Sequence, residues 1–452
     1  MKRRGLTKRG GNAKDQPKKK AKQTIGDDAF DWSAAGGQDV IASDSEADDK
    51  DGNATSDEED DEEIQETADE KRLRLAKEYL GKIAEQEEGD DDDGVDRVGA
   101  RLHQDALEAS GKLFKTIADQ FQDFEFDSDS IRFLRGHRLP VTCVCLMEDG
   151  RTAFSAAKDG SLLRWDLAQQ TKTKLKLPED DVAETKSDHD RAILSVAVSS
   201  DGKFLATGGH DKLVRVWNPE TNELMESFSG HRDTISAVCF RLRSHSLFTG
   251  SFDRSIKHWN LTEMGYVETL FGHQSEVNGL DALYRERVTS CGRDRSVRMW
   301  KIPEETQLVF YGNSGSMDCV KMVSEEYHVT GGDDGSLSLW FNGRKKPVSV
   351  IHNAHGGKWI SSAAVMPRTD LVASGSADGV IRLWKADLSA RTLEPVATVP
   401  LVGSVNGLCF DNKGRFLLAA VSQEHRLGRW DRIKEAKNGL ALIALPNVDE
   451  EN

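Results

Sequence analysis

The sequence TGSFDRSIKHW, at residues 249–259, has six counterparts in the chain. Before it come SAAKDGSLLRW (155–165) and TGGHDKLVRVW (207–217), and after it come SCGRDRSVRMW (290–300), TGGDDGSLSLW (330–340), SGSADGVIRLW (374–384) and AAVSQEHRLGRW (419–430). Each ends in tryptophan, and successive tryptophans are separated by about 40 to 50 residues, the length of a propeller blade. Seven such units predict an all-β fold, a seven-bladed β-propeller with four strands in each blade.

Three polar positions recur at fixed distances from the tryptophan. An aspartate stands six residues before it and a serine or threonine four residues before that aspartate, and five units also have an upstream histidine. Because buried polar groups need partners, we expect these side chains to form a hydrogen-bonded chain inside each blade, with the aspartate in a tight turn. The residues assigned to this network are His137, Asp159, Trp165, His189, Asp211, Trp217, His231, Asp253, Trp259, His273, Asp294, Trp300, Asp334, Trp340, His355, Asp378 and Trp384.

Two units depart from the pattern. The fifth has Gly312 at the histidine position, and the seventh has Val402 there, with Ala420 and Glu424 replacing the hydroxyl and the aspartate. We expect packing to hold these two blades without the full network, so that their edges are looser.

Two further segments bear on the outline of the propeller. Closing the ring requires a strand from one terminus beside strands from the other, and both 130–135 and 439–446 qualify. The polar stretch 169–188 lengthens the first interval and predicts a protruding surface loop.

Neither catalysis nor a metal site is indicated. The His–Ser–Asp sets resemble a hydrolase triad, but they recur once per blade in five units, whereas a catalytic site occurs once. The six cysteines form no CxxC pair and have no histidine at zinc spacing, so we interpret them as reduced core residues. No apolar run is long enough for a membrane span, and no apolar stretch follows the basic N-terminus as in a secretory signal. We therefore predict no enzyme activity and no cofactor.

The net charge of -16 is unevenly distributed. Residues 1–26 are strongly basic, residues 27–70 strongly acidic, and residues 131–452 carry equal numbers of both signs. The basic clusters indicate a nuclear localisation signal or a nucleic-acid-binding arm, as opposed to a merely solvated tail, and we favour nuclear import. Residues 1–66 are predicted to be a disordered arm and residues 447–452 an acidic tail.

Residues 67–125 are predicted to form two amphipathic helices. A capping box at 67–70 precedes the first, and a stripe of apolar residues marks the second. The stripe consists of Val95, Val98, Leu102, Ala106, Ala109, Leu113, Ile117 and Phe121. Neither helix has a core of its own, so each must dock on the propeller (130–446) or on a partner, and we favour a partner.

The repeated TGS, Asp and Trp phrases identify residues 131–452 as WD40 repeats by resemblance. Three longer phrases resemble one family, the WD40 subunit of the U3 small nucleolar ribonucleoprotein: EKRLRLAKEYLGKIAEQEE (70–88), DRVGARLHQDALEASGKLFKTIA (96–118) and LRGHRLPVTCVCLMEDGRTAFSAAKDGSLLRWDL (134–167). The resemblance implies a nucleolar protein that binds the box B/C element of U3 snoRNA beside a kink-turn-binding protein and other box C/D proteins. It also implies a role in pre-rRNA processing within the small-subunit processome, whose components the N-terminal helices would contact.

Basic residues cluster around the aspartate turns and histidine loops of the first four units. The candidates for RNA binding are Arg138, Lys158, Arg191, Lys212, Arg232, Arg254, Arg293 and Arg295. We expect this sector of one face to contact RNA phosphates, with Phe252 or Trp359 available to stack on bases. The alternative is that lysine and arginine are simply common in exposed turns.

Two other functions fit parts of the sequence. A nuclear histone- or peptide-binding WD40 scaffold shares the fold, the basic clusters and the acidic tract, but it predicts an acidic or aromatic pocket, whereas the turns here are mostly basic. A substrate receptor of a ubiquitin ligase would need an adaptor motif before the blades, and the sequence has none that we recognise.

Overall fold

The computed structural model describes residues 114–122, 124–127, 130–175, 192–312 and 315–446. These residues belong to one compact unit, Lys77–Asn452. Within the described ranges the chain forms 28 strands and one short 3-10 helix, η1 (Ala118–Phe121), which makes this part all-β as predicted. The predicted charged arm, the first predicted helix and the acidic tail lie outside the described residues.

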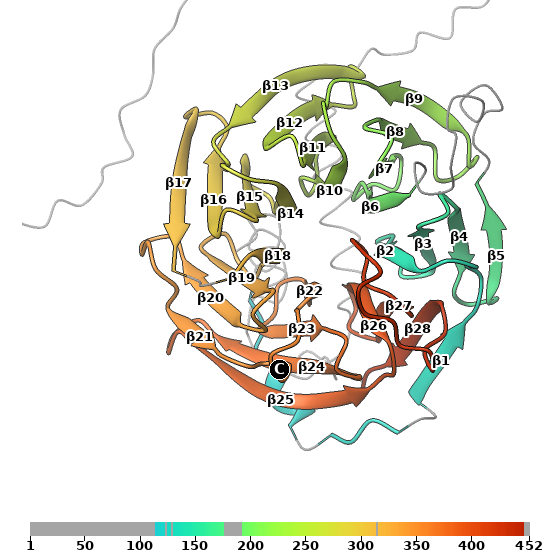
Figure 1. Ribbon diagram of the computed structural model, residues 1–452, viewed down its shortest axis with the longest axis vertical. Coiled ribbons are helices and arrows are strands. Elements are labelled where there is room, and N and C mark those ends of the chain that lie inside the picture. The colour runs from blue at the N-terminus through green and yellow to red at the C-terminus, as the bar shows by residue number, and fades with distance from the viewer. Residues whose placement is uncertain (1–113, 123, 128–129, 176–191, 313–314, 447–452) are drawn as a thin grey trace, which may run out of the picture. The chain divides into compact units, whose positions relative to one another are not determined.

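The strands form seven antiparallel sheets of four, the seven blades of a ring (Figure 1). Blades 1 and 2 consist of β2 (Val141–Leu146), β3 (Thr152–Ala157), β4 (Leu162–Asp166) and β5 (Thr171–Lys174), then β6 (Ile193–Val198), β7 (Leu205–Gly209), β8 (Val214–Trp217) and β9 (Leu224–Phe228). Blades 3 and 4 consist of β10 (Ile235–Phe240), β11 (Ser246–Ser251), β12 (Ser255–Asn260) and β13 (Gly265–Phe271), then β14 (Val277–Asp281), β15 (Arg287–Gly292), β16 (Ser296–Lys301) and β17 (Thr306–Tyr311).

The remaining blades follow the same plan, except that blade 7 includes the first strand of the chain. Blades 5 and 6 consist of β18 (Met317–Met322), β19 (Tyr327–Gly332), β20 (Leu337–Phe341) and β21 (Ser349–Ile351), then β22 (Ser362–Val365), β23 (Leu371–Gly375), β24 (Val380–Asp387) and β25 (Thr392–Pro400). Blade 7 consists of β26 (Ser404–Phe410), β27 (Phe416–Ser422), β28 (Gly439–Ala444) and β1 (Ile131–Leu134).

The first strand of each blade in sheet order lies nearest the central channel (Figure 1). These inner strands contact one another around the ring, and β2 contacts both β6 and β26, so the ring is complete. Their sequences are apolar and β-branched, and all six residues of β10 are buried. Outer strands such as β13 are mostly exposed or half-buried. Burial on both faces explains why the inner strands lack the alternating pattern of a one-sided sheet.

The hydrophobic core is divided among the interfaces between blades. Trp217 of blade 2 packs with Phe154 and Leu162 of blade 1. Trp259 of blade 3 packs in the same way with Val214 of blade 2. The repeated tryptophan therefore fills the interface with the preceding blade as well as donating a hydrogen bond.

Blade 7 contains both ends of the propeller. β1 pairs antiparallel with β28, with Ile131 opposite Ile443 and Leu134 opposite Leu440. β28 pairs in turn with β27. The ring is thus closed by both segments that the sequence offered: 130–135 supplies the outermost strand of the blade and 439–446 the strand beside it.

The assignment of Trp430 as the tryptophan of the seventh unit is wrong. Trp430 lies in the loop between β27 and β28, and 61% of its surface is exposed. In other blades the tryptophan pairs with the strand before it, as Trp259 does with Leu247. In blade 7 Leu442 occupies that position, opposite Leu418. The inserted loop places a tryptophan at blade spacing although it belongs to no strand.

Two smaller expectations are also corrected. Part of the stretch predicted to be a loop, 169–188, is the outer strand β5, and its residues from 176 onward lie outside the described ranges. Ile117 and Phe121 do not continue an α-helix, because Lys115 forms a parallel bridge with Thr369 and η1 follows. Both apolar side chains are buried in the core of blades 6 and 7, so this end of the predicted helix docks on the propeller and not on a partner.

Candidate nucleic-acid interface

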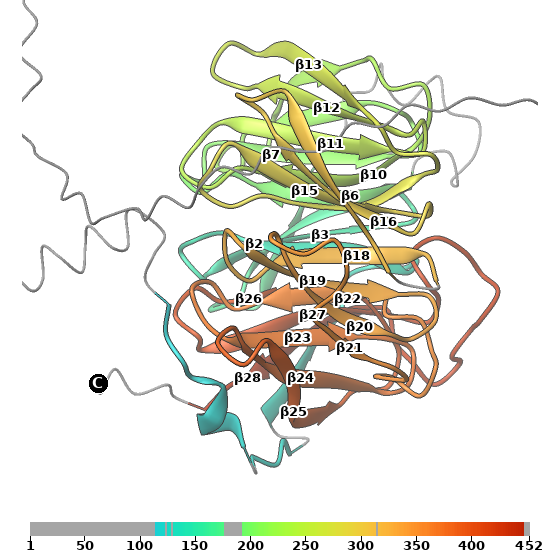
Figure 2. The same cartoon turned by 90° about the vertical axis from the view of Figure 1, so that its left-hand side faces the viewer.

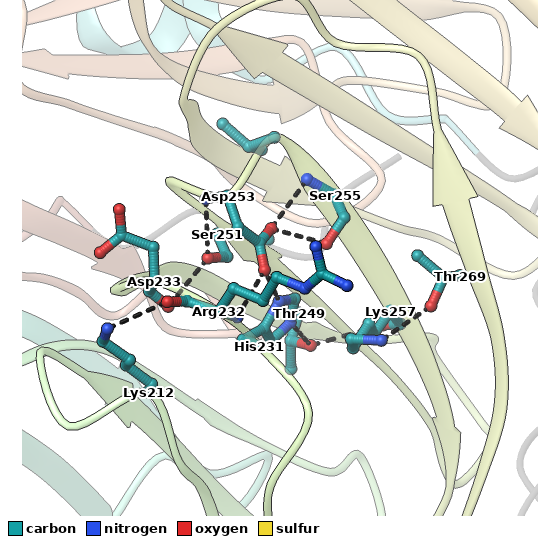
Figure 3. A network of polar contacts seen from close by, with 12 residues as sticks. Lys212, His231, Arg232, Asp233, Thr249, Ser251, Asp253, Ser255, Lys257 and Thr269 are labelled. Atoms are coloured by element: carbon teal, nitrogen blue, oxygen red, sulfur yellow. Dashed lines mark hydrogen bonds and ion pairs between the residues drawn. The ribbon is translucent and has the colours of Figure 1, made fainter.

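The predicted hydrogen-bond network is complete in blade 3 (Figure 3). His231 Nδ1 lies 3.0 Å from Asp253 Oδ2, and His231 Nε2 lies 2.9 Å from Thr249 Oγ1. Trp259 Nε1 donates to the same threonine oxygen at 2.9 Å. The backbone N–H and the hydroxyl of Ser255 donate to the other oxygen of Asp253. The network therefore ties the histidine loop to the aspartate turn and to two strands.

Blades 4 and 6 contain the same network, with histidine–aspartate distances of 3.0 and 2.9 Å. Its members are His273, Ser290, Asp294 and Trp300 in blade 4, and His355, Ser374, Asp378 and Trp384 in blade 6. In blade 1 Ser161 stands between the two residues: its Oγ lies 2.8 Å from His137 Nδ1 and 2.5 Å from Asp159 Oδ1. Trp165 donates to Ser155 as expected.

The network is partial in blades 2 and 5. Trp217 and Trp340 still donate to Thr207 and Thr330, at 3.1 and 2.9 Å. Asp211 pairs with Arg215, and Asp334 accepts hydrogen bonds from Ser336. His189 lies outside the described residues, and Gly312 has no side chain to offer.

These sets are structural in geometry. The side chains of His231, His273 and His355 are completely buried, so no substrate reaches them. Burial alone would raise the pKa of the Asp253 carboxyl, but hydrogen bonds from His231, Ser255 and the Arg232 amide outweigh it and hold the pKa well below its usual range. Burial also lowers the pKa of His137 to about 4, which keeps that ring neutral.

The histidine–aspartate bonds place the aspartate turns and the histidine loops on one face of the ring, here called the top face. Figure 2 shows the loop after β27 protruding on this side, and the segment before β1 on the opposite, bottom side. Most of the predicted RNA-binding residues are exposed on the top face. They are Arg138, Lys212, Arg232, Arg254, Arg293 and Arg295.

Three of these residues occupy the same strained backbone position. The residue after the turn aspartate is glycine in blades 1, 5 and 6, with φ of 72°, 73° and 91° for Gly160, Gly335 and Gly379. In blades 2, 3 and 4 it is Lys212, Arg254 or Arg295, with φ of 66°, 70° and 61°. A left-handed conformation costs an L-residue about 1–2 kcal/mol, so these long cationic side chains occupy positions that favour glycine.

Exposed aromatic rings stand at the rim beside two of these turns. Phe271 is 74% exposed and lies opposite Ser255, the residue after Arg254. Tyr311 is 54% exposed and lies opposite Ser296, the residue after Arg295. The sequence analysis did not identify either residue; the signal that it missed is an aromatic at the end of an outer strand, where the other blades have none.

The loop between β27 and β28, residues 423–438, is a second feature of the top face that the sequence analysis missed. Arg426 reaches across the channel and donates to the backbone carbonyls of Asn278 and Asp318 in blades 4 and 5. At its end Asn438 donates to the carbonyl of Arg138, next to blade 1. The loop is therefore fixed over the channel and joined to the basic sector. Its signal in the sequence is the mismatch of the seventh unit.

Lys158 is not exposed as the RNA-binding prediction requires. It is buried, donates to the carbonyl of Gly428 at 2.9 Å, and lies 3.8 Å from the carboxylate of Glu424. Arg429 and Arg432 lie beside the same carboxylate, at 3.4 and 3.8 Å, and remain about half exposed. Lys158 thus anchors the loop, while the two arginines extend the positive charge outward. Arg191 lies outside the described residues.

Three aromatic rings meet on this loop. Trp359 lies 5.2 Å from His425 and 5.3 Å from Trp430, measured between ring centroids. They line a cavity of about 270 Å³ together with Lys358, Gln423 and Asp431. Trp359, which the sequence analysis proposed for base stacking, is thus half-buried in a cluster whose outermost ring is Trp430. Phe252 is half-buried next to Asp253.

Two other classes of site were searched for in the described part of the chain. No helix there is long and apolar enough to cross a membrane. In the same residues no group of three or more His, Cys, Asp or Glu side chains is arranged to hold a metal ion. All six cysteines are free thiols, four buried and two half-buried.

Known proteins share both the sequence and the fold. Residues 76–268 match the model of the WD repeat-containing protein 75 second beta-propeller, and residues 265–301 and 345–385 match the WD domain, G-beta repeat. The chain is 43% identical over 393 residues to U3 small nucleolar RNA-interacting protein 2 of Homo sapiens, covering 84% of this chain and 82% of that protein. A U3 snoRNP-associated protein-like protein of Arabidopsis thaliana is 37% identical, with 83% and 85% covered. The solved structure described as "Structure of U3-55K" is 45% identical with a TM-score of 0.67, covering 71% of this chain and 100% of that one.

Proposed function

Because this chain belongs to the family of U3 small nucleolar RNA-interacting, U3 snoRNP-associated WD40 proteins, we propose that it is a non-catalytic subunit of the U3 small nucleolar ribonucleoprotein. In that role it binds U3 snoRNA, through the box B/C region, and acts in pre-rRNA processing and small ribosomal subunit biogenesis. Its place of action is the nucleolus. The basic clusters of residues 1–26 serve nuclear import.

The top face of the propeller is the RNA-binding surface in this proposal. The observation that carries it is a band of exposed cations that runs from Arg429 and Arg432 past Arg138 to the turns of blades 2, 3 and 4. Aromatic rings stand at both ends of the band, Trp430 at one and Phe271 and Tyr311 at the other. Cations that follow a phosphate backbone, interleaved with rings that stack on unpaired bases, are the usual means of binding single-stranded RNA.

The proposal extends to protein partners. A kink-turn-binding protein and other box C/D proteins would share the RNA with the top face, and processome components would contact the predicted N-terminal helices. A histone- or peptide-binding scaffold is not favoured, because the exposed turns of blades 2 to 4 carry arginine and lysine and do not form an acidic pocket.

Charge reversal tests the assignment of the top face. The triple variant Arg254→Glu, Arg293→Glu, Arg295→Glu is compared with Lys203→Glu, Arg285→Glu, Lys413→Glu, which reverses three exposed cations in loops of the bottom face. Binding of full-length protein to U3 snoRNA and to an unrelated box C/D RNA is measured over a salt series. If the three arginines contact phosphates, only the first variant weakens binding, and its plot of log K against log salt becomes shallower by about 3.

Two results would contradict the proposal. Unchanged binding and an unchanged salt slope in the top-face variant would remove this sector and leave the basic arm as the source of affinity. Equal affinity of the parent protein for both RNAs would contradict its specificity for U3 snoRNA.

A further inference from the structure

The bottom face has an apolar cavity at the mouth of the central channel. Its volume is about 320 Å³, and six blades contribute apolar side chains to its wall. These include Met147, Val198, Leu242, Leu283, Val323 and Phe410. Each stands at or just after the end of an inner strand, where the chain leaves the channel. An apolar hollow of this size at the end of a channel is suited to burying side chains of another segment.

The described chain begins in this cavity. Phe114 lies in its wall and packs against the cluster that contains Val323. The next residues are fixed on blade 6, since the Lys115 amide donates to the carbonyl of Arg368 at 2.9 Å. The Ile117 amide donates to Asp370 Oδ1 at 2.8 Å. Consecutive Cα atoms are about 3.8 Å apart, so the residues before Phe114 must start at the mouth of the channel.

The segment that precedes Phe114 has the composition to fill the cavity. Its apolar residues Val95, Val98, Leu102, Ala106, Ala109 and Leu113 recur at helical spacing. A helix over 95–113 would be roughly 30 Å long and would present these residues on one face. That face has no core of its own to cover it, and alanines in its middle allow close approach to the cavity rim.

We propose that residues 95–113 dock across the bottom mouth of the channel and bury this apolar face in the cavity. A second copy of the chain is the less suitable occupant, because Phe114 tethers the segment beside the cavity and gives it a high effective concentration there. Docking closes the bottom of the channel and directs the charged arm away from the top face. The inference does not depend on RNA binding.

A reporter cysteine tests the docking in the full-length chain. Asn412 is exposed and lies in the cavity wall, whereas its neighbour Lys413 is exposed and does not. Burial raises the pKa of the native thiols, for example that of Cys143 to about 12, so they react slowly with a bulky maleimide. We expect Asn412→Cys to be labelled about tenfold faster after Leu102→Glu undocks the segment, the factor for a docking free energy of about 1.4 kcal/mol.

The controls separate docking from its alternatives. Labelling of Lys413→Cys should not respond to Leu102→Glu, and Arg101→Glu, off the apolar stripe, should leave Asn412→Cys protected. A photo-crosslinker at residue 106 should in addition react with cavity residues such as Met147. The inference is overturned if Leu102→Glu leaves the labelling of Asn412→Cys unchanged while crosslinks fall outside the cavity. It is also overturned if protection rises with protein concentration, which would indicate a second copy.

Discussion

Single residues of the top face show a conflict between backbone preference and surface charge. Lys212, Arg254 and Arg295 adopt positive φ at a position where three other blades have glycine. None of the three takes part in the buried networks, which use the preceding aspartate. Their side chains therefore add charge to the surface at a cost in backbone energy, the reverse of what selection for stability alone would leave.

Replacing Arg254 by glycine should separate binding from stability. Removing the left-handed strain gains about 1–2 kcal/mol, and the greater freedom of glycine in the unfolded chain loses about 0.5–1 kcal/mol. The free energy of unfolding should thus stay level or rise by about 1 kcal/mol in denaturant titrations, while affinity for U3 snoRNA falls. The mirror variant Gly379→Arg, at φ 91° with open space around it, should lower stability. A clear loss of stability in Arg254→Gly would contradict this account of the turn.

His328 is a second residue at odds with its surroundings. It is fully buried in blade 5, stacked on Trp340 and edge-on to Phe310, and neither ring nitrogen has a hydrogen-bond partner among the described residues. Burial lowers its pKa from 6.5 to about 3, so the ring stays neutral in the folded protein. The unfolded chain takes up a proton as the pH falls below 6.5, and stability is therefore lost from about pH 6.5 down to pH 3.

His328→Phe should stabilise the protein. It keeps the aromatic packing and removes a buried polar group without partners, which is worth about 1–3 kcal/mol. The gain should grow as the pH drops below 6.5, because the variant no longer has this proton uptake in the unfolded state. Thermal unfolding between pH 7.5 and 5 measures both effects, with His352→Gln, at an exposed histidine, as the control. A lower midpoint for His328→Phe at every pH would show that the nitrogens are solvated after all.

At the scale of elements, the loop of residues 423–438 is the largest departure from the blade pattern. Trp430→Ala should weaken binding of U3 snoRNA by about 1–3 kcal/mol, the usual contribution of a ring that stacks on a base. Trp430→Phe should restore most of the affinity. The melting temperature should change little in either variant, because the ring is mostly exposed. If the affinity of Trp430→Ala equals that of the parent protein, the loop has no stacking role.

Elements with a repeated function were predictable from the sequence. The tryptophan, aspartate and histidine positions follow from hydrogen bonds and packing that every blade needs, so a local phrase determines them. The loop around Trp430 could not be placed in this way, since its contacts to Lys158, Asn278 and Asp318 join residues far apart in the chain. Lys158 illustrates the same limit: its turn predicts exposure, and only the loop folded over it accounts for its burial.

At the scale of the whole molecule, stability depends on how the ring is closed. Deleting residues 1–135 removes η1 and β1, and with them the buried side chains Ile117, Phe121 and Leu134. Their burial contributes about 5–9 kcal/mol, comparable to the total stability of a domain. The deletion also uncovers the edge of β28, which can then pair with other chains.

We therefore expect the chain that lacks residues 1–135 to unfold without cooperativity or to aggregate. The chain that lacks only residues 1–94 keeps β1, η1 and the proposed docking segment, and it should melt like the full-length protein. Circular dichroism during heating and size-exclusion chromatography compare the two. Equal, cooperative melting of both would show that three strands suffice for blade 7.

The pairing of β1 with β28 also has a consequence for synthesis on the ribosome. β1 is made before any blade, yet the strand beside it is made after all the others, so it waits unpaired while almost the whole propeller emerges. Blades 1 to 6 have all their strands by then, but the ring stays open until the last strand arrives. A nascent chain thus carries an unpaired strand throughout translation, and a stop codon shortly before residue 439 would leave every such chain unable to close.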